Sequence, residues 1–357
     1  MTILCPFWGR RTQRSTWPDY ADELIRVGPE FLELSDLAGA DIAVFPMSCR
    51  PLFARPDGLE LAQRFDERTK QAGKLSVFFY DGADTSYQRF PIEGAVVVRG
   101  SIYRSRRGAS EFALPGFHDD LTKYTGGELP IRHKSGRPVV SFCGALIREY
   151  PPSNALGRAR RLVGDVRRSW WRAHGRHEED LWIRAKAVDA LDAQEKVGTS
   201  FVLRASGGGG TWDQFDEKRW QEVRREYVEN MVGADYTLCA RGDGNWSFRF
   251  YESLCLGRIP VFVDSDCVLP YEFLVDWRDY VVWISRDEVP TIGERIAAFH
   301  EQLSDREFVD LQRECRRLWE EWLSPQGFFR NFHRHFDFGS TGVGSVTPIR
   351  VSGARDA

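Results

Sequence analysis

Residues 234–264 read ADYTLCARGDGNWSFRFYESLCLGRIPVFVD and carry the clearest pattern of secondary structure in the chain. This stretch begins with a short apolar run, Tyr236–Cys239, passes through a loop with two glycines, and continues as a helix-compatible segment at 247–256. A second apolar run, Ile259–Val263, follows a tight turn. Two apolar runs on either side of a helix are typical of a βαβ unit in a parallel sheet.

The same alternation extends through most of the chain. In the first half, apolar runs that read as buried strands lie at 2–5, 42–45, Leu75–Tyr80, 95–98 and 139–142. In the second half, further strands are expected at 200–204 and 280–284, and helices near 218–230 and 305–323. Strands that alternate with helices predict the α/β class, with parallel sheets covered by helices.

The length of the chain predicts two domains. It has 357 residues, more than the ~100–200 residues of an average domain, and we expect each half to form a Rossmann-like unit. We assign residues 1–165 to an N-terminal domain, 166–325 to a C-terminal domain, 326–338 to an aromatic segment that packs back on the N-terminal domain, and 339–357 to a flexible tail.

Composition narrows the class of protein. A hydrophobic fraction of 42% excludes a disordered chain, and a net charge of −3 gives no reason to expect a nucleic-acid partner. The apolar runs are strand-sized, and the N-terminus lacks the pattern of a signal peptide, so we expect no transmembrane segment and a cytoplasmic location. The seven cysteines include no C-x-x-C pair, which favours reduced thiols over disulfides or a zinc site.

The loop before the helix at 247–256 has the features of a phosphate site. Arg241 and Gly242 precede Ser247, where the free N–H groups and the positive end of the helix dipole favour an anion. Arg249 suits a diphosphate because its guanidinium can bond two oxygens, and Glu252 suits the hydroxyls of a ribose. One alternative remains open: Ser247 caps the helix, and Arg249 and Glu252 form an exposed ion pair.

Four motifs in this part of the chain occur in the order found in one enzyme family. They are Leu-Cys-x-Arg-Gly at 238–242, Ser-x-Arg-Phe-x-Glu-x-Leu at 247–254, Gly-x-Ile-Pro-Val at 257–261, and Asp-Trp at 276–277. The segment resembles the donor domain of the exostosin family of glycosyltransferases. Ala240 departs from the proline usual in that family but removes no polar group.

The resemblance implies a GT-B fold, in which two Rossmann-like domains face each other across a cleft. It places the nucleotide sugar on the C-terminal domain and the acceptor mainly on the N-terminal domain, and it implies inversion at the anomeric carbon. Carried over by position, the donor-binding residues are Arg241, Gly242, Ser247, Arg249 and Glu252, and we add Arg204 and Phe250 to the expected donor-binding set. In that assignment Arg241 and Arg249 bind the diphosphate, and Glu252 binds the ribose or the sugar. Gly242 and Gly257 allow close approach of the backbone.

Other residues give weaker predictions. An inverting transfer requires a base for the acceptor hydroxyl, and Asp81 is our first candidate, followed by Asp84, His118 and Asp119. We therefore take Asp81, Arg249 and Glu252 as the candidate catalytic residues. Arg204 and the glycines at 207–210 are expected to form a loop over the donor.

The sequence Asp264-Ser265-Asp266 matches the D-x-D pattern that binds a divalent metal in the other large glycosyltransferase fold. We expect instead a turn or cap after the strand, because the GT-B arrangement that the resemblance implies stabilises the leaving group with protein side chains. No metal or other cofactor is expected.

These observations predict a glycosyltransferase that moves a sugar from a UDP- or GDP-linked donor to a glycan or other hydroxyl acceptor, in surface polysaccharide biosynthesis. The alternative is a non-catalytic nucleotide- or glycan-binding protein on the same fold. The presence of Arg241, Arg249 and Glu252 favours the enzyme. A phosphorylase or epimerase of the same fold would not explain the run from 241 to 260.

Overall fold

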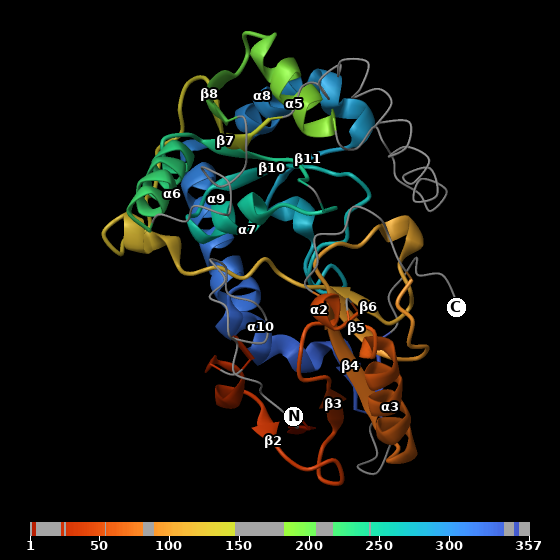
Figure 1. Ribbon diagram of the computed structural model, residues 1–357. Coiled ribbons are helices and arrows are strands. Elements are labelled where there is room, and N and C mark those ends of the chain that lie inside the picture. The colour runs from red at the N-terminus through yellow and green to blue at the C-terminus, as the bar shows by residue number, and fades with distance from the viewer. Residues whose placement is uncertain are drawn as a thin grey trace, which may run out of the picture.

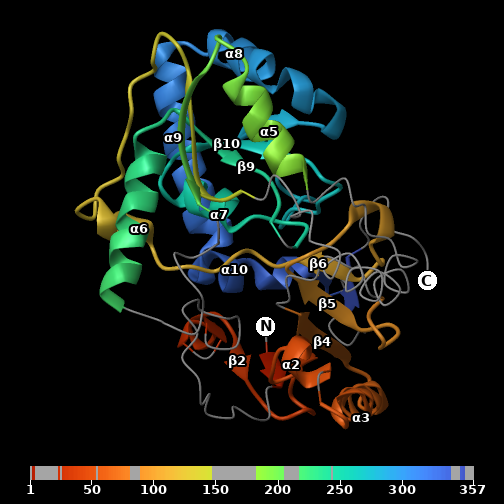
Figure 2. The ribbon, with the colours of Figure 1, turned by 45° about the horizontal axis from the view of Figure 1, so that its top comes forward.

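The computed structural model describes residues 2–4, 23–24, 26–53, 55–80, 89–146, 182–204, 217–242, 244–338 and 346–349. Two parallel β-sheets lie in separate halves of the molecule (Figure 1). Helix α10 (Pro325–Asn331) lies between the two halves, as both views show (Figure 1, Figure 2). No helix in the described ranges is long and apolar enough to cross a bilayer.

The N-terminal sheet has the strand order β2-β1-β3-β4-β5-β6, and its neighbouring strands run parallel. Strand β4 (Leu75–Tyr80) carries four consecutive buried residues, as expected for a parallel strand covered on both faces. Helices α2 (Cys49–Phe53) and α3 (Gly58–Gln71) pack against β4. The other strands are β1 (Thr2–Leu4), β2 (Glu33–Leu34), β3 (Ile42–Val44), β5 (Val96–Arg99) and β6 (Glu111–Ala113).

The C-terminal sheet has the order β11-β10-β9-β7-β8 and is also parallel. Every residue of β9 (Tyr236–Cys239) and β10 (Ile259–Val263) is buried. The other strands are β7 (Val139–Ala145), β8 (Gly198–Arg204) and β11 (Val282–Ile284). The helices of this half are α5 (Ile183–Asp192), α6 (Glu217–Val232), α7 (Phe248–Cys255), α8 (Ile292–Gln302) and α9 (Asp305–Leu318).

Two parallel sheets with helices on their faces confirm the predicted α/β class and agree with the two Rossmann-like units of the GT-B fold that we expected. One strand differs from the expectation. We placed the run at 139–142 in the N-terminal domain, but β7 pairs with β8 and β9 in the second sheet. The second sheet therefore begins at Val139, before the boundary expected after residue 165. Asp235 fixes this arrangement: its carboxylate accepts a 2.8 Å hydrogen bond from the Val139 amide and pairs with Arg132.

The C-terminal aromatic segment returns to the first sheet. A π-helical turn, Trp319–Leu323, ends the run of α9, and Ser324 begins α10 by accepting a 3.0 Å hydrogen bond from the Gly327 amide. Phe332 then stacks on Phe79 of β4, with ring centroids 5.7 Å apart. The aromatic segment therefore joins the two halves through side-chain packing.

Candidate functional site

A cavity of about 330 Å³ lies at the carboxyl ends of β7, β8 and β9. Ligands of open parallel sheets bind at this edge. Among the described residues, the cavity wall contains four arginines, Arg184, Arg204, Arg224 and Arg249, and one carboxylate, Glu252. The excess of positive charge fits an anionic ligand. Aromatic side chains complete the wall, namely Trp220, Tyr227, Trp246 and Phe248.

Arg249, the second residue of α7, is held against the end of β7. Its Nη2 donates a 2.8 Å hydrogen bond to the Cys143 carbonyl, and its Cζ lies 4.3 Å from the centroid of the Phe142 ring. The residue is 9% exposed, and among the described residues Nε has no hydrogen-bond partner and the guanidinium has no carboxylate partner. A buried cation without a counter-ion is costly, so this group is suited to receive an anion.

Gly144 makes room for this guanidinium. A Cβ atom at Gly144 would lie 2.6 Å from Arg249 Nη2, too close for any side chain to be added without moving the arginine. Gly242 likewise makes room for Arg184, because a Cβ atom at Gly242 would lie 3.0 Å from Arg184 Nη2. Both glycines line the cavity, and at Gly242 the absence of a side chain leaves room for Arg184.

Glu252 is 1% exposed and bonds to two residues of α6. Arg224 Nη1 donates a 2.8 Å hydrogen bond to one carboxylate oxygen, and the Tyr227 hydroxyl donates to the other. Burial opposes ionisation, but the charges of Arg224 and His118 and the Tyr227 hydrogen bond outweigh it, so the pKa of Glu252 lies below its ordinary value. Glu252 is thus a buried carboxylate paired with Arg224; the exposed pair with Arg249, our alternative, is not formed.

The wall also contains residues that the sequence did not identify, among them Arg184, Arg224 and Tyr227. Arg184 lies in the first turn of α5 and donates hydrogen bonds to the carbonyls of Ala145 (3.1 Å) and Ala240 (3.3 Å). It therefore connects the end of β7 to the loop after β9. The sequence offers no signal for Arg224, because it is one of several charged residues along α6.

The remaining predicted donor residues divide into two groups. Arg204 and Ser247 line the cavity; Arg204 pairs with Glu226, and Ser247 is the N-cap of α7 without a side-chain capping bond. Phe250 instead points into the core, where its ring lies 5.3 Å from the rings of Phe262 and Trp277. Its burial gives it a packing role in place of the donor contact that we expected.

Arg241 also lies away from the cavity wall. Its Nη1 donates a 2.9 Å hydrogen bond to the hydroxyl of Tyr103, which belongs to the N-terminal half, and its Cζ lies 5.5 Å from the Tyr103 ring. The residue is buried. In this structure Arg241 is therefore an interdomain contact, in place of the diphosphate contact that the motif implies.

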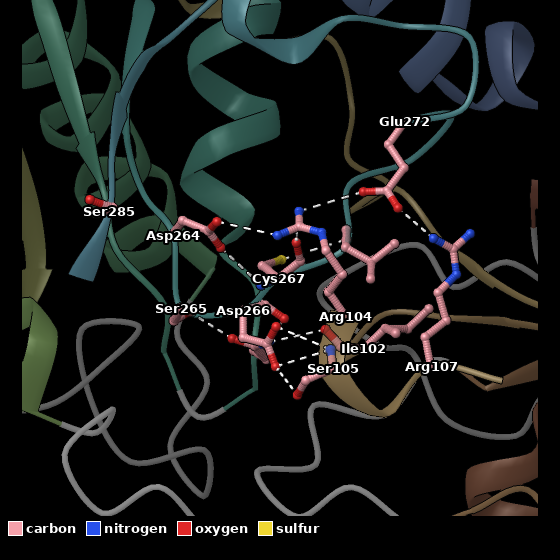
Figure 3. A network of polar contacts seen from close by, with 12 residues as sticks. Ile102, Arg104, Ser105, Arg107, Asp264, Ser265, Asp266, Cys267, Glu272 and Ser285 are labelled. Atoms are coloured by element: carbon pink, nitrogen blue, oxygen red, sulfur yellow. Dashed lines mark hydrogen bonds and ion pairs between the residues drawn. The ribbon is translucent and has the colours of Figure 1, made fainter. Parts of the chain in front are cut away.

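The D-x-D sequence belongs to a second interdomain contact, which Figure 3 shows and which we call the clasp: residues 102–107 against 264–272. Asp264 accepts hydrogen bonds from Arg104 (3.3 Å) and from the Cys267 amide (3.1 Å). The Asp266 carboxylate accepts a 3.1 Å bond from the Ser105 amide. Within the described ranges no cluster of three or more potential metal ligands exists. The two carboxylates thus bond to a turn and to the other domain.

Of the four candidate bases, the described residues include His118 and Asp119 but not Asp81 and Asp84. The glycines at 207–210, expected to form a loop over the donor, also lie outside the described residues. His118 is buried and stacks on Trp319 at 5.4 Å, with Nδ1 2.8 Å from the Asp119 carbonyl, and burial lowers its pKa. Asp119 pairs with Lys123. Neither His118 nor Asp119 lines the cavity.

Comparison with known proteins relates most of the cavity wall, from Arg184 to Glu252, to a recognised domain. The family model for the Exostosin GT47 domain matches residues 165–299. Exostosin-1 of Drosophila melanogaster is 32% identical over 123 residues, which are 32% of this chain and 15% of that protein. A probable β-1,4-xylosyltransferase of Arabidopsis thaliana is 32% identical over 83 residues, 22% of this chain and 20% of the relative. The matches thus span about a fifth or less of these relatives.

Among solved structures, the crystal structure of TarM covers 88% of this chain and 57% of its own, with a TM-score of 0.36 and 8% sequence identity. The fold assignment rests on the strand pairing of the two sheets, described above.

Proposed function

We propose that this chain, whose residues 165–299 match the Exostosin GT47 domain, is a glycosyltransferase that uses a nucleotide-sugar donor. The observation that carries the proposal is the buried guanidinium of Arg249, which among the described residues has no carboxylate partner and faces a cavity lined by three further arginines. A diphosphate supplies two negative groups and several oxygens, which match such a site in charge and in hydrogen-bonding capacity.

The donor diphosphate is proposed to bind the Arg249 guanidinium at the N-terminal end of α7, with Ser247 beside it. In the reaction an acceptor hydroxyl oxygen attacks the anomeric carbon, the bond from that carbon to the phosphate oxygen breaks, and its electron pair leaves with the nucleoside diphosphate. Arg249 stabilises the negative charge that develops on the leaving oxygen. The acceptor proton passes to a base, for which Asp81 is our candidate, and attack from the opposite face inverts the anomeric carbon.

The donor is proposed to be UDP- or GDP-linked, the acceptor a glycan hydroxyl in surface polysaccharide synthesis, and the reaction metal-independent. The last point is supported by the clasp, in which Asp264 and Asp266 already bond to Arg104 and to the Ser105 amide. The competing possibility is a protein that binds nucleotides without catalysis, and only a turnover measurement separates the two.

The test has two stages. First, the melting temperature of the purified chain is measured with UDP, GDP, CMP and dTDP; a bound nucleotide at a hundredfold excess over Kd stabilises the folded state by about 2.7 kcal/mol. Second, sugar derivatives of the nucleotide that binds are incubated with glycan acceptors, and release of nucleoside diphosphate is followed. Binding with acceptor-dependent release supports the enzyme, binding without release supports the non-catalytic alternative, and absence of binding contradicts the donor site.

A further inference from the structure

We propose that Arg224 and Tyr227, both on α6, are positioning residues that orient the Glu252 carboxylate to accept hydrogen bonds from the ribose hydroxyls, and thereby make the cavity select ribonucleotides over deoxyribonucleotides. This inference rests on the proposed function, since it concerns the nucleotide part of the same donor. Neither residue belongs to the motifs of the sequence analysis.

The geometry supports a fixed carboxylate. Arg224 Nη1 lies 2.8 Å from one oxygen of Glu252, and the Tyr227 hydroxyl bonds to the other, so rotation of the carboxylate would break both bonds. Arg224 and Tyr227 are three residues apart on α6 and therefore project from one face of that helix. Both line the cavity beside Glu252.

The carboxylate retains capacity for a ligand. An ionised carboxylate offers about four lone-pair positions, of which Arg224 and Tyr227 use one on each oxygen. One further acceptor position remains on each oxygen, the number needed for two neighbouring hydroxyl groups. An ionised carboxylate has no hydrogen to donate, so it can only accept hydrogen bonds from a third group. A ribose diol supplies such donors.

Arg224 has a second effect, on the charge of Arg249. Glu252 and Arg249 are three residues apart on α7, a spacing at which an acid and an arginine commonly pair. Because Arg224 pairs with Glu252, the carboxylate is not drawn to Arg249, whose charge remains for the diphosphate. The ring of Tyr227 lies near both guanidinium groups, 5.0 Å from Arg224 Cζ and 5.8 Å from Arg249 Cζ.

Substitutions of Arg224 and of Tyr227 should therefore change nucleotide binding in different ways. Tyr227→Phe removes one donor to Glu252 but leaves the Arg224 pair, so it should weaken discrimination at the ribose and leave affinity for a deoxynucleotide nearly unchanged. Arg224→Gln also frees Glu252 to pair with Arg249, so it should weaken binding of both nucleotides. Arg224→Lys keeps the charge and should restore deoxynucleotide binding.

The experiment measures Kd by calorimetry for UDP and 2′-deoxy-UDP, and for GDP and 2′-deoxy-GDP, on the full chain. Because hydrogen bonds to a charged group are the stronger class, we expect the unaltered protein to prefer the ribonucleotide by about tenfold or more. Tyr227→Phe should reduce that preference to about threefold or less. The matched control is Tyr236→Phe, which removes another buried tyrosine hydroxyl, bonded to His300 at 2.9 Å and remote from the cavity wall, and should keep the full preference.

The outcomes separate this inference from the proposed function. If UDP or GDP binds but the deoxy form binds equally well, or if folded Tyr227→Phe keeps the full preference, the positioning role is wrong while the donor site stands. If Tyr227→Phe fails to fold, the Arg224→Gln and Arg224→Lys pair decides, and equal deoxynucleotide affinity in both overturns the proposal. If neither nucleotide binds the unaltered protein, the proposed function fails together with it.

Discussion

Replacing Arg249 with methionine tests the donor site directly. Methionine keeps an unbranched, flexible apolar side chain but is shorter than arginine, and it removes the charge and all the donors. If Arg249 donates two charge-assisted hydrogen bonds to the diphosphate, at about 1.5–3 kcal/mol each, the loss is roughly 3–6 kcal/mol. At about 1.4 kcal/mol for each factor of ten, the affinity should fall roughly a hundredfold to ten-thousandfold.

The same change should have a small effect on folding, because two terms oppose each other. The variant loses the 2.8 Å bond to the Cys143 carbonyl and the contact over Phe142, together about 2–5 kcal/mol. It also removes a buried charge without a carboxylate partner in the described ranges, and that burial costs several kcal/mol. We expect a net change within about 2 kcal/mol, or roughly 4–8 °C in melting temperature for a domain of ordinary size.

The assay pairs calorimetric titration of nucleotide with a thermal melt of the same preparation, and Arg249→Lys serves as the intermediate case because it keeps the charge but loses the planar fork. Two results would refute the reasoning. One is nucleotide affinity unchanged in a folded Arg249→Met variant. The other is a fall in melting temperature of well over 10 °C, which would assign Arg249 chiefly to the stability of the domain.

Three further changes have defined outcomes. Gly144→Ala should push the Arg249 guanidinium from its position and lower nucleotide affinity by about tenfold, the cost of one charge-assisted bond, whereas Gly136→Ala, with open space around it, should bind as the unaltered protein does. EDTA should leave sugar transfer intact, and activity that disappears and returns with manganese would contradict metal independence. Burial lowers the pKa of His335 from 6.5 to about 4, so the unfolded chain binds the extra proton between these values. Stability should fall as the pH drops from about 6.5 to 4, and melts of His335→Gln across that range should show a smaller loss.

The strands could be predicted from the sequence where burial is complete. The expected limits of β9 and β10 agree with the structure, and α7 begins one residue after Ser247 as its cap requires. In parallel strands covered on both faces, an unbroken apolar run marks the whole strand. The apolar run does not show which strand it pairs with, and for that reason β7 was assigned to the wrong sheet.

The sequence could predict only those site residues that lie close to one another in the chain. Arg249, Ser247 and Glu252 lie at the cavity because one loop and one helix turn bring them there. Arg224 is 28 residues from Glu252 in the sequence and lies on a helix rich in charge, so nothing local distinguishes it from a solvated side chain. Contacts between elements depend on the packing of α6 against the sheet, which the pattern of α6 alone does not specify.

The loop between β9 and α7 shows why a motif can locate a site without assigning each of its residues. Gly242 and Gly244 line the cavity, whereas Arg241 bonds to Tyr103 and the Asn245 amide donates a 2.9 Å bond to Ser101, both in the N-terminal half. Neighbouring residues of one loop thus line the cavity and contact the other domain. Because the same backbone carries both sets of contacts, a rotation of the N-terminal domain that strains the Arg241 contact must also move the glycines at the cavity. We therefore expect the shape of the cavity and the orientation of the two domains to be coupled through this loop.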